Sequence, residues 1–175
     1  MVELQYPIGR FQFEGDVTAA QRRDWIAQIA AAPGQLREAV RGLSAQQLDT
    51  PYRPGGWTLR QVVHHLPDSH LNSYSRFRLA LTEDNPTIKP YDQSRWAALE
   101  DARSAPVEAS LRLFQGLHER WVLLLQSMSE ADFARTYVHP ERGVVHLGRE
   151  VGLYAWHGRH HVAHITSLRE RLGWR

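Results

Sequence analysis

The sequence of 175 residues has the length of one domain with a full hydrophobic core, and we expect residues 1–175 to form a single domain. Its net charge of +2, with histidine neutral, argues against nucleic acid as a partner. It contains no cysteine, which excludes disulfides, thiolate metal sites and cysteine nucleophiles. Because no apolar run has the length of a membrane span or of a signal peptide, a cytoplasmic location is expected.

The first part of the chain predicts an arm followed by a helix. Residues 1–17 are poor in helix formers, so we expect an N-terminal arm packed on the body of the protein. Thr18 and Gln21 have the spacing of a capping box, which predicts a helix from there to about residue 43. Pro33, followed by a glycine, interrupts this helix and predicts either a kink or two separate helices.

A second long helix is predicted after a stretch rich in turn-forming residues at 44–56. Thr58 and Gln61 form another capping box, and the apolar positions beyond them support a helix to about residue 83. Pro67 lies inside this helix, where it removes one backbone hydrogen bond, so a local bend is expected beside it.

The second half predicts two more long helices. Residues 84–105 form a long connection with one helical turn around 92–100, and Pro106 suits the first position of the next helix. Residues 136–146 predict a small hairpin, and the last helix should run from Arg149 to Leu172 and end at Gly173. Long amphipathic helices with little strand predict an all-α, antiparallel four-helix bundle.

Four histidines fall within eight residues of the last predicted helix, at positions 157, 160, 161 and 164. At about 100° per residue, His157, His161 and His164 share one face. Two imidazoles at spacing i, i+4 are a common way for a helix to bind one metal ion. A further ligand must come from elsewhere, and our candidate is His65 on the second predicted long helix.

A purely structural role for these histidines and tryptophans is the alternative to metal binding or catalysis. The cluster at 157–164 could be a solvated histidine-rich face, and His118, His139 and His146 are expected to be packed, hydrogen-bonded residues. Trp57 and Trp156 are expected in the core rather than in catalysis. The cluster also lacks the glutamate of the His-Glu-x-x-His metalloprotease motif.

Three neutral imidazoles on a divalent ion leave coordination positions open, which suits metal-assisted hydrolysis or activation of a thiol co-substrate. Asp68, one turn after His65, either orients a ligand imidazole or accepts a proton, or it is simply a surface carboxylate near Arg60 or Arg76. Asn72 lies one turn further along and shares both interpretations.

With these residues in place, the chain resembles the DinB/YfiT-like family of metal-dependent hydrolases over nearly its whole length. The segments that carry the resemblance include Gly55-Gly-Trp-Thr58, Arg60-Gln-Val-Val-His-His-Leu66, Asn72-Ser-Tyr74, His139-Pro140 and Trp156-His157 through Trp174. Several short matches in the same order are far more specific than one pair of histidines.

The resemblance implies three histidine ligands, with water completing the coordination. The family's first ligand lies eight residues after the tryptophan that opens its helix, which is His65 here. The other two lie at i, i+4 about twelve residues before the final glycine, which gives His157 and His161. The register His160 with His164 has the same spacing and stays open; in the first register, these two histidines line the pocket or support a ligand.

The resemblance also implies one divalent metal per chain, zinc or nickel, a small-molecule substrate and a homodimer. A related branch resembles thiol S-transferases that use bacillithiol or a similar low-molecular-weight thiol, so thiol transfer is the alternative to hydrolysis. A third hypothesis is a non-catalytic, metal-stabilised stress protein, and a fourth is a helical domain without metal.

Overall fold

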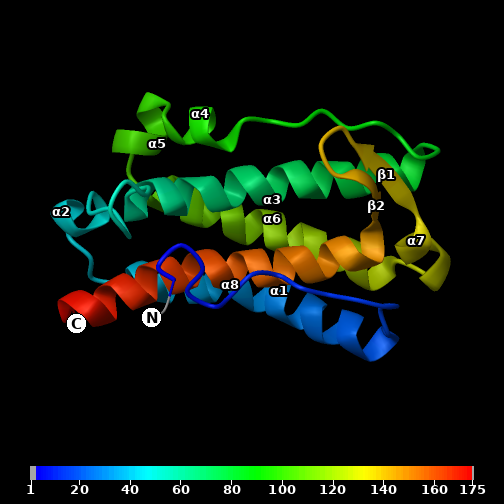
Figure 1. The fold of residues 1–175 in the computed structure, drawn as a ribbon, viewed down its shortest axis with the longest axis horizontal. Coiled ribbons are helices and arrows are strands. Elements are labelled where there is room, and N and C mark those ends of the chain that lie inside the picture. The colour runs from blue at the N-terminus through cyan, green and yellow to red at the C-terminus, as the bar shows by residue number, and fades with distance from the viewer. Residues whose placement is uncertain (1–2, 175) are drawn as a thin grey trace.

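The structure is a computed structural model that describes residues 3–174. Four long helices dominate it: α1 (Ala19–Val40), α3 (Leu59–Thr82), α6 (Glu108–Ser127) and α8 (Leu147–Leu172) (Figure 1). They pack side by side along one axis, which confirms the predicted four-helix bundle. Within the described residues, no helix combines the length and the apolar character that crossing a membrane requires.

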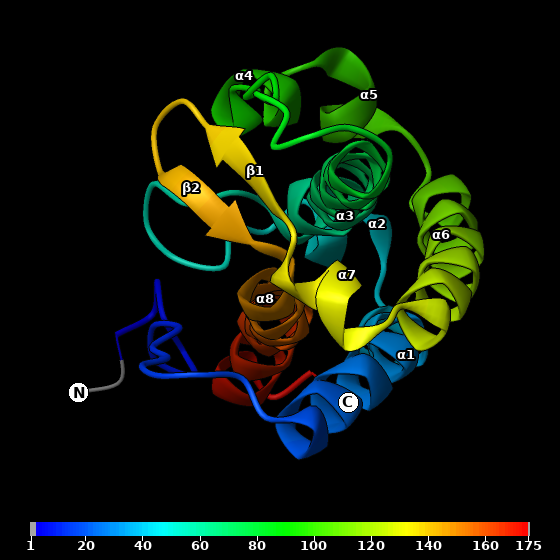
Figure 2. The same cartoon turned by 90° about the vertical axis from the view of Figure 1, so that its right-hand side faces the viewer.

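Each long helix contacts two others around the bundle. Helices α1 and α3 each pack against both α6 and α8, so α1 and α3 lie diagonally opposite one another (Figure 2). The long connection at 83–107 carries the chain back along the outside of α3 before α6 begins. As a result, α3 and α6 run in the same direction, and α1 and α8 run in the opposite one (Figure 1).

Shorter elements lie near the two ends of the bundle. They are α2 (Ala45–Leu48), α4 (Gln93–Ala97), α5 (Glu100–Ser104), α7 (Glu130–Ala134), β1 (Thr136–His139) and β2 (Gly143–His146). Of these, α4 and α5 lie on the outer side of α3 (Figure 1, Figure 2). The strands pair antiparallel, so the predicted hairpin is confirmed. The connection contains two short helices where one turn was predicted, α6 begins two residues after Pro106, and α8 begins directly after the hairpin at Leu147.

Helix α1 runs without a break through Pro33, which excludes the second of the two predicted alternatives, a division into two helices. The flanking Ile29 and Leu36 are fully buried, and their packing holds the two halves in line. Since proline has no N–H, the carbonyl of Ile29 lacks its usual partner four residues on. It accepts a hydrogen bond from Nδ1 of His118 on α6 instead, at 2.7 Å. Helix α3 likewise continues through Pro67.

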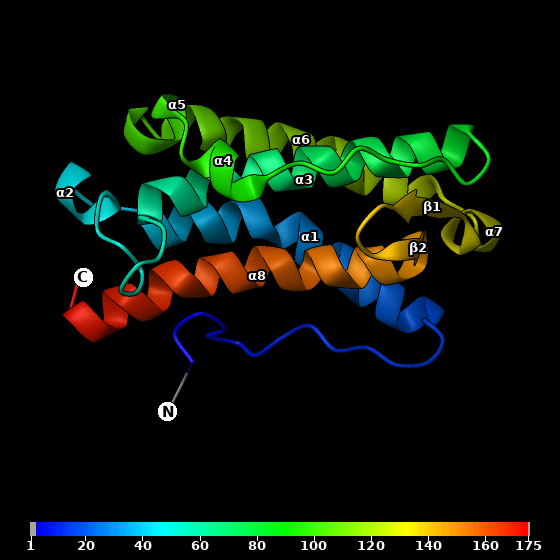
Figure 3. The ribbon, with the colours of Figure 1, turned by 45° about the horizontal axis from the view of Figure 1, so that its top comes forward.

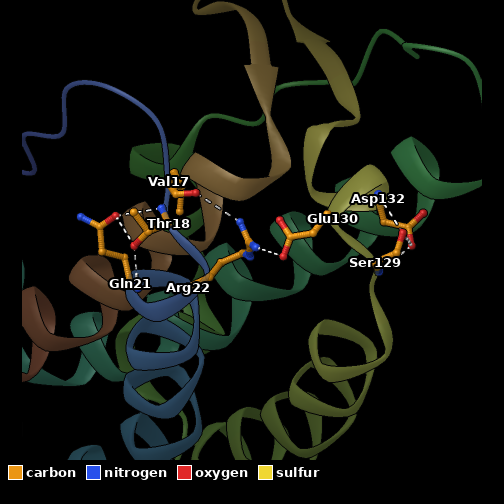
Figure 4. Close-up of polar contacts among 7 residues, drawn as sticks. All are labelled: Val17, Thr18, Gln21, Arg22, Ser129, Glu130 and Asp132. Carbon is orange, nitrogen blue, oxygen red and sulfur yellow. Dashed lines mark hydrogen bonds and ion pairs between the residues drawn. The ribbon is translucent and has the colours of Figure 1, made fainter.

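The predicted capping box at the start of α1 is present (Figure 4). The backbone N–H of Gln21 donates to Thr18 Oγ1 at 3.2 Å, and the backbone N–H of Thr18 donates to Gln21 Oε1 at 2.9 Å. Ser129 caps α7 in the same manner. The buried Arg22 pairs with Glu130, which ties the start of α1 to α7 (Figure 4).

The N-terminal segment up to residue 17 contains no helix or strand in its described part and lies along α8 (Figure 3). Trp156 Nε1 donates to the Gly9 carbonyl at 3.1 Å, and Arg149 donates to the Phe13 carbonyl at 2.6 Å. The Phe13 ring meets Trp25 edge-on at 5.2 Å. These contacts tie the arm to α8 and to the start of α1.

The core consists of two apolar clusters. One, which includes Leu36, Leu59 and Leu168, lies where α3 begins and α8 ends. The other, which includes Phe77 and Trp121, lies toward the hairpin. Histidines from α3, α6 and α8, all buried except the half-buried His157, lie between the two clusters, and we call them the histidine layer: His65, His70, His118, His157, His161 and His164.

Candidate metal centre

The fold brings His65 of α3 against two histidines of α8. His65 Nε2 lies 3.4 Å from His157 Nε2, and the His65 and His161 ring centroids are 4.7 Å apart. One nitrogen from each of the three side chains lies within 4.8 Å of the other two. Two segments more than ninety residues apart in sequence therefore direct imidazole nitrogens toward one point.

This arrangement fits a divalent metal ion. Zinc binds imidazole nitrogen at about 2.0–2.1 Å, so two nitrogens on one tetrahedral ion lie about 3.4 Å apart. The separation of 3.4 Å between the His65 and His157 nitrogens matches that value. The three nitrogens are also the borderline-soft donors that zinc, nickel, copper and iron accept.

The three histidines are neutral at pH 7, as ligands have to be. Burial, followed by the charge of His164, lowers the pKa of His65 to about 4. Burial, followed by repulsion from His65, holds the pKa of His157 well below its ordinary value. The pKa of His161 is lowered in the same way by burial and then by His157. Each ring therefore keeps a lone pair for a metal.

A second group of three histidines is within the same distance limit: His160, His161 and His164. All three come from one helix, and adjacent residues such as His160 and His161 point about 100° apart. His164 is already engaged, because its Nε2 donates to the carbonyl of Gln5 at 3.0 Å and its Nδ1 lies 3.3 Å from His161 Nδ1. The geometry favours the group that draws on two helices.

A pocket of about 440 Å³ opens beside these histidines. The N-terminal arm, the loop at 49–58, the start of α4 and the middle of α8 form its walls. Arg53 is the charged side chain that lines it, and no aspartate or glutamate of the described chain does so. His160 lines the pocket too, and its buried Nδ1 has no hydrogen-bond partner among residues 3–174. The electrostatics favour an anionic ligand.

The loop at 49–58 positions the aromatic side of the site. The Trp57 ring packs against His65 with 4.8 Å between centroids, and Tyr52 stacks on His164 at 4.0 Å. Gly55 has a φ of +68°, and a Cβ on Gly56 would lie 2.7 Å from Arg53 Cγ, so this turn requires both glycines. The Pro-Gly-Gly run before Trp57 was the sequence signal for this loop.

Trp57 and Trp156, which we expected in the core, are only partly buried and line the pocket. They pack at the boundary between the core and the open space beside the histidines. A propensity for burial does not separate these two positions, because a large ring often has one face in the core and one in a cavity.

Asp68 and Asn72 are placed differently from the histidines. The Asn72 side chain donates to the backbone carbonyl of Asp68 at 2.8 Å. Burial and then the charge of Asp101 on α5 raise the pKa of Asp68 to about 6. Within residues 3–174, neither side chain has a hydrogen bond to His65 or lines the pocket. The structure thus gives neither residue the supporting or proton-accepting contact considered from the sequence.

Sequence reasoning missed the part played by His70 and His118. His70 is fully buried, and its Nε2 lies 3.1 Å from Nδ1 of His157. Its Nδ1 lies 2.9 Å from Nε2 of His118, whose Nδ1 reaches the Ile29 carbonyl. Neither residue stands at a helical spacing that marks a metal site, so only the packing of three helices reveals this connection.

Comparisons with known proteins agree with the fold and with a metal-dependent family. The DinB superfamily matches residues 28–165. Proteins named "Putative metal-dependent hydrolase" from Bacillus mycoides (strain KBAB4) and Bacillus cereus (strain 03BB102) are 56% and 55% identical over 174 residues, which is 99% of this chain and 100% of each relative.

A solved structure is described as "YfiT from Bacillus subtilis is a probable metal-dependent hydrolase with an unusual four-helix bundle topology". It matches with a TM-score of 0.96 and 47% identity, over 98% of this chain and 99% of that chain. The match covers the four long helices, the hairpin and the segments that carry the histidines. This chain belongs to the DinB superfamily.

Proposed function

We propose that this protein binds one divalent metal ion per chain, zinc or nickel, through His65, His157 and His161, and that it is a metal-dependent hydrolase of a small molecule. The observation that carries the proposal is the convergence of three neutral imidazoles beside an open pocket. The names of the relatives, which span the same length, support the reaction class.

A divalent ion on three neutral imidazoles supplies Lewis acidity and keeps coordination positions open. Side chains around the pocket exclude water and orient the substrate. Trp57 covers His65 and excludes water from that side. Arg53 can orient a negatively charged substrate group at the pocket, and His160 lines the same pocket.

Thiol S-transfer is the second candidate, and the composition of the pocket favours it. The described lining offers Arg53 but no carboxylate, so a thiolate would meet a positive field and no acidic repulsion. A low-molecular-weight thiol such as bacillithiol would then replace water as the nucleophile. Hydrolysis and thiol transfer use the same metal ligands and differ only in this second reactant.

Metal content tests the proposal first. Protein purified without a histidine tag should contain about one metal ion per chain, and His157→Ala should contain close to none, because one of three ligands is lost. His146→Ala is the matched control, since His146 is exposed and lies outside both histidine groups. A wild-type metal content near zero would leave only a helical domain without metal.

A turnover assay separates the reactions. Metal-loaded protein is incubated with a panel of esters, amides and electrophiles, with and without bacillithiol. Hydrolysis without thiol supports the hydrolase and contradicts the transferase, whereas turnover that depends on thiol does the reverse. Tight metal binding without turnover of any substrate, with or without bacillithiol, would favour the metal-stabilised stress protein.

A homodimer is the last part of the proposal. Leu113 and Leu123 of α6 are 49% and 67% exposed, which gives this helix apolar surface that a second chain could cover. Light scattering after size exclusion should give twice the chain mass of 20.1 kDa. A mass of one chain at micromolar concentration would contradict this part.

A further inference from the structure

A line of three imidazoles, two buried and the last half-buried, runs from the backbone of α1 to the candidate metal centre. His118 Nδ1 lies 2.7 Å from the Ile29 carbonyl oxygen, and His118 Nε2 lies 2.9 Å from His70 Nδ1. His70 Nε2 lies 3.1 Å from His157 Nδ1. His157 Nε2 is then the nitrogen that faces His65.

The Ile29 carbonyl determines which ring nitrogen carries the proton in each histidine of this line. A carbonyl oxygen only accepts, so His118 must carry its proton on Nδ1. A neutral imidazole has a single N–H, so His118 Nε2 accepts and His70 Nδ1 donates. Because His70 carries its proton on Nδ1, its Nε2 accepts, and His157 Nδ1 donates to it. Its Nε2 is left with a lone pair directed at the metal centre.

Pro33 is the reason that this carbonyl is available. In an uninterrupted helix, the N–H of residue 33 would donate to the Ile29 oxygen, but proline has none. The oxygen instead takes its hydrogen bond from His118, across the interface between α1 and α6. A proline that weakens α1 locally therefore provides a fixed acceptor in a fully buried place.

The other ligand on α8 is held by a second line of the same kind. His164 Nε2 donates to the carbonyl of Gln5 in the N-terminal arm at 3.0 Å, so His164 Nδ1 accepts. His161 Nδ1, at 3.3 Å, is the donor to it. The Nε2 of His161 is thereby left with the lone pair.

We infer that two backbone carbonyls, those of Ile29 and Gln5, fix the tautomers of five histidines so that His157 and His161 each present an unprotonated Nε2 to the metal centre. His70, His118 and His164 are then positioning residues, which orient ligands without touching the metal. The role of the lines in metal binding rests on the proposed function, whereas the tautomers themselves are a property of the metal-free chain.

Nitrogen-15 NMR of the metal-free protein tests the tautomers directly. Long-range correlations between ring nitrogens and carbon-bound protons distinguish Nδ1–H from Nε2–H. We expect Nδ1–H for His118, His70, His157 and His161, and Nε2–H for His164. An Nε2–H signal from His70 or His157 in folded protein would overturn the inference, whatever the protein binds.

Metal affinity, measured by competition with a chelator, tests what the first line does. His118→Phe should weaken binding by about 10–100-fold, because His70 loses the acceptor that fixes its proton. His70→Phe should lose a similar amount. His70→Gln should remain within about threefold of wild type, because an amide oxygen can accept from His157 in place of the ring.

His164→Phe tests the second line, since phenylalanine can keep the stacking on Tyr52 but makes no hydrogen bond to His161. We expect a loss of about 10–100-fold in affinity here too. His139→Phe is the matched control for removing a buried histidine, because His139 lies in the hairpin and outside both lines. Far-UV circular dichroism and thermal unfolding of each variant identify any that fail to fold.

The outcomes separate the two proposals. If the wild type shows the expected tautomers but binds no metal, the proposed function fails and the carbonyl-anchored lines stand. If the wild type binds metal but His118→Phe, His70→Phe and His164→Phe bind it as tightly as His139→Phe does, the positioning role is wrong.

Discussion

Two polar clusters in this protein differ in whether their polar atoms are all paired internally or are left facing a pocket. At the hairpin, Glu150 is 1% exposed and accepts hydrogen bonds from the Tyr137 hydroxyl at 2.7 Å and from Arg142 at 2.7 and 3.2 Å. All of its contacts are internal. The histidine layer begins at two backbone carbonyls and ends where three ring nitrogens converge beside a pocket.

The clusters also differ in charge. The Glu150 carboxylate is compensated by Arg142, and burial followed by Glu150 raises the pKa of Tyr137. In the histidine layer, burial lowers the pKa of each ring, to about 4 at His118, so the layer is neutral. In a charged cluster that closes on itself, removing one partner leaves the other uncompensated and destabilises the fold, whereas a neutral cluster with converging lone pairs is prepared to receive a cation.

The largest expected effect comes from removing the ligand that α3 contributes. His65→Ala should weaken metal binding by about a hundredfold or more, because two imidazoles on one helix remain of the three. The measurement is a metal titration by competition with a chelator. If His65→Ala binds as the wild type does while His160→Ala loses the metal, the other histidine group is the centre.

Removing the carboxylate of the closed cluster should affect stability instead. Glu150→Leu leaves Tyr137 and Arg142 without their acceptor, and we expect the free energy of unfolding to fall by about 2 kcal/mol, a value kept low because Arg142 is 40% exposed. Urea unfolding measures it. Metal affinity should stay within about twofold of wild type, since only loss of a ligand or its support changes it.

Glu141→Leu is the matched control for that substitution, because Glu141 is an exposed carboxylate in the hairpin that Glu150 contacts. It should leave both quantities close to wild type. A large loss of metal affinity in Glu150→Leu, but not in Glu141→Leu, would show that the two clusters are coupled and would contradict the distinction drawn between them.

The neutral layer predicts how the stability of the metal-free protein depends on pH. The pKa of His118 and His164 in the layer is lowered to about 4, and that of His160, which lines the pocket beside the layer, to about 3. Burial is the main cause, and the pKa in the unfolded chain is about 6.5. Between these values the unfolded chain binds more protons, so the free energy of unfolding falls as the pH drops from 7 to 4.5.

Each such histidine contributes up to about 1.4 kcal/mol per pH unit below pH 6. Urea unfolding in the presence of a chelator at pH 7, 6 and 5 checks the slope. His160→Phe should give a shallower slope because one titrating ring is gone. Equal or greater stability at pH 5 than at pH 7 would contradict a neutral, buried layer.

The smallest effect is expected from a contact that belongs to neither cluster. Thr18→Ala removes the side-chain acceptor of the first capping box, and we expect the free energy of unfolding to fall by about 1 kcal/mol. Thr18→Ser, which keeps the hydroxyl, is the control. Metal affinity should not change in either variant, and a change would mean that general loss of stability loosens the centre.

Much of the fold follows from local signals in the sequence. The capping boxes at Thr18 and Thr58, the hairpin after α7 and the glycine that ends α8 each mark a boundary of an element within a few residues. Of the two alternatives predicted at Pro33, two separate helices did not form, because tertiary packing of Ile29 and Leu36 outweighs the loss of one backbone hydrogen bond.

The candidate site could be predicted only in part. The spacing of His157 and His161 follows from the period of a helix, and His65 is both the candidate third ligand from the sequence and the ligand that the family resemblance implies. The roles of His70 and His118 depend on which faces of α3, α6 and α8 meet, and no spacing within one helix encodes that. The pocket likewise depends on how the loop at 49–58 and the arm approach α8.

Anomalous diffraction from crystals of the tag-free protein, collected above and below the absorption edges of zinc and nickel, tests the central claim most directly. We expect one peak per chain, at about 2.1 Å from Nε2 of His65, His157 and His161. A peak among His160, His161 and His164 instead, or no peak in protein that carries stoichiometric metal in solution, would contradict it.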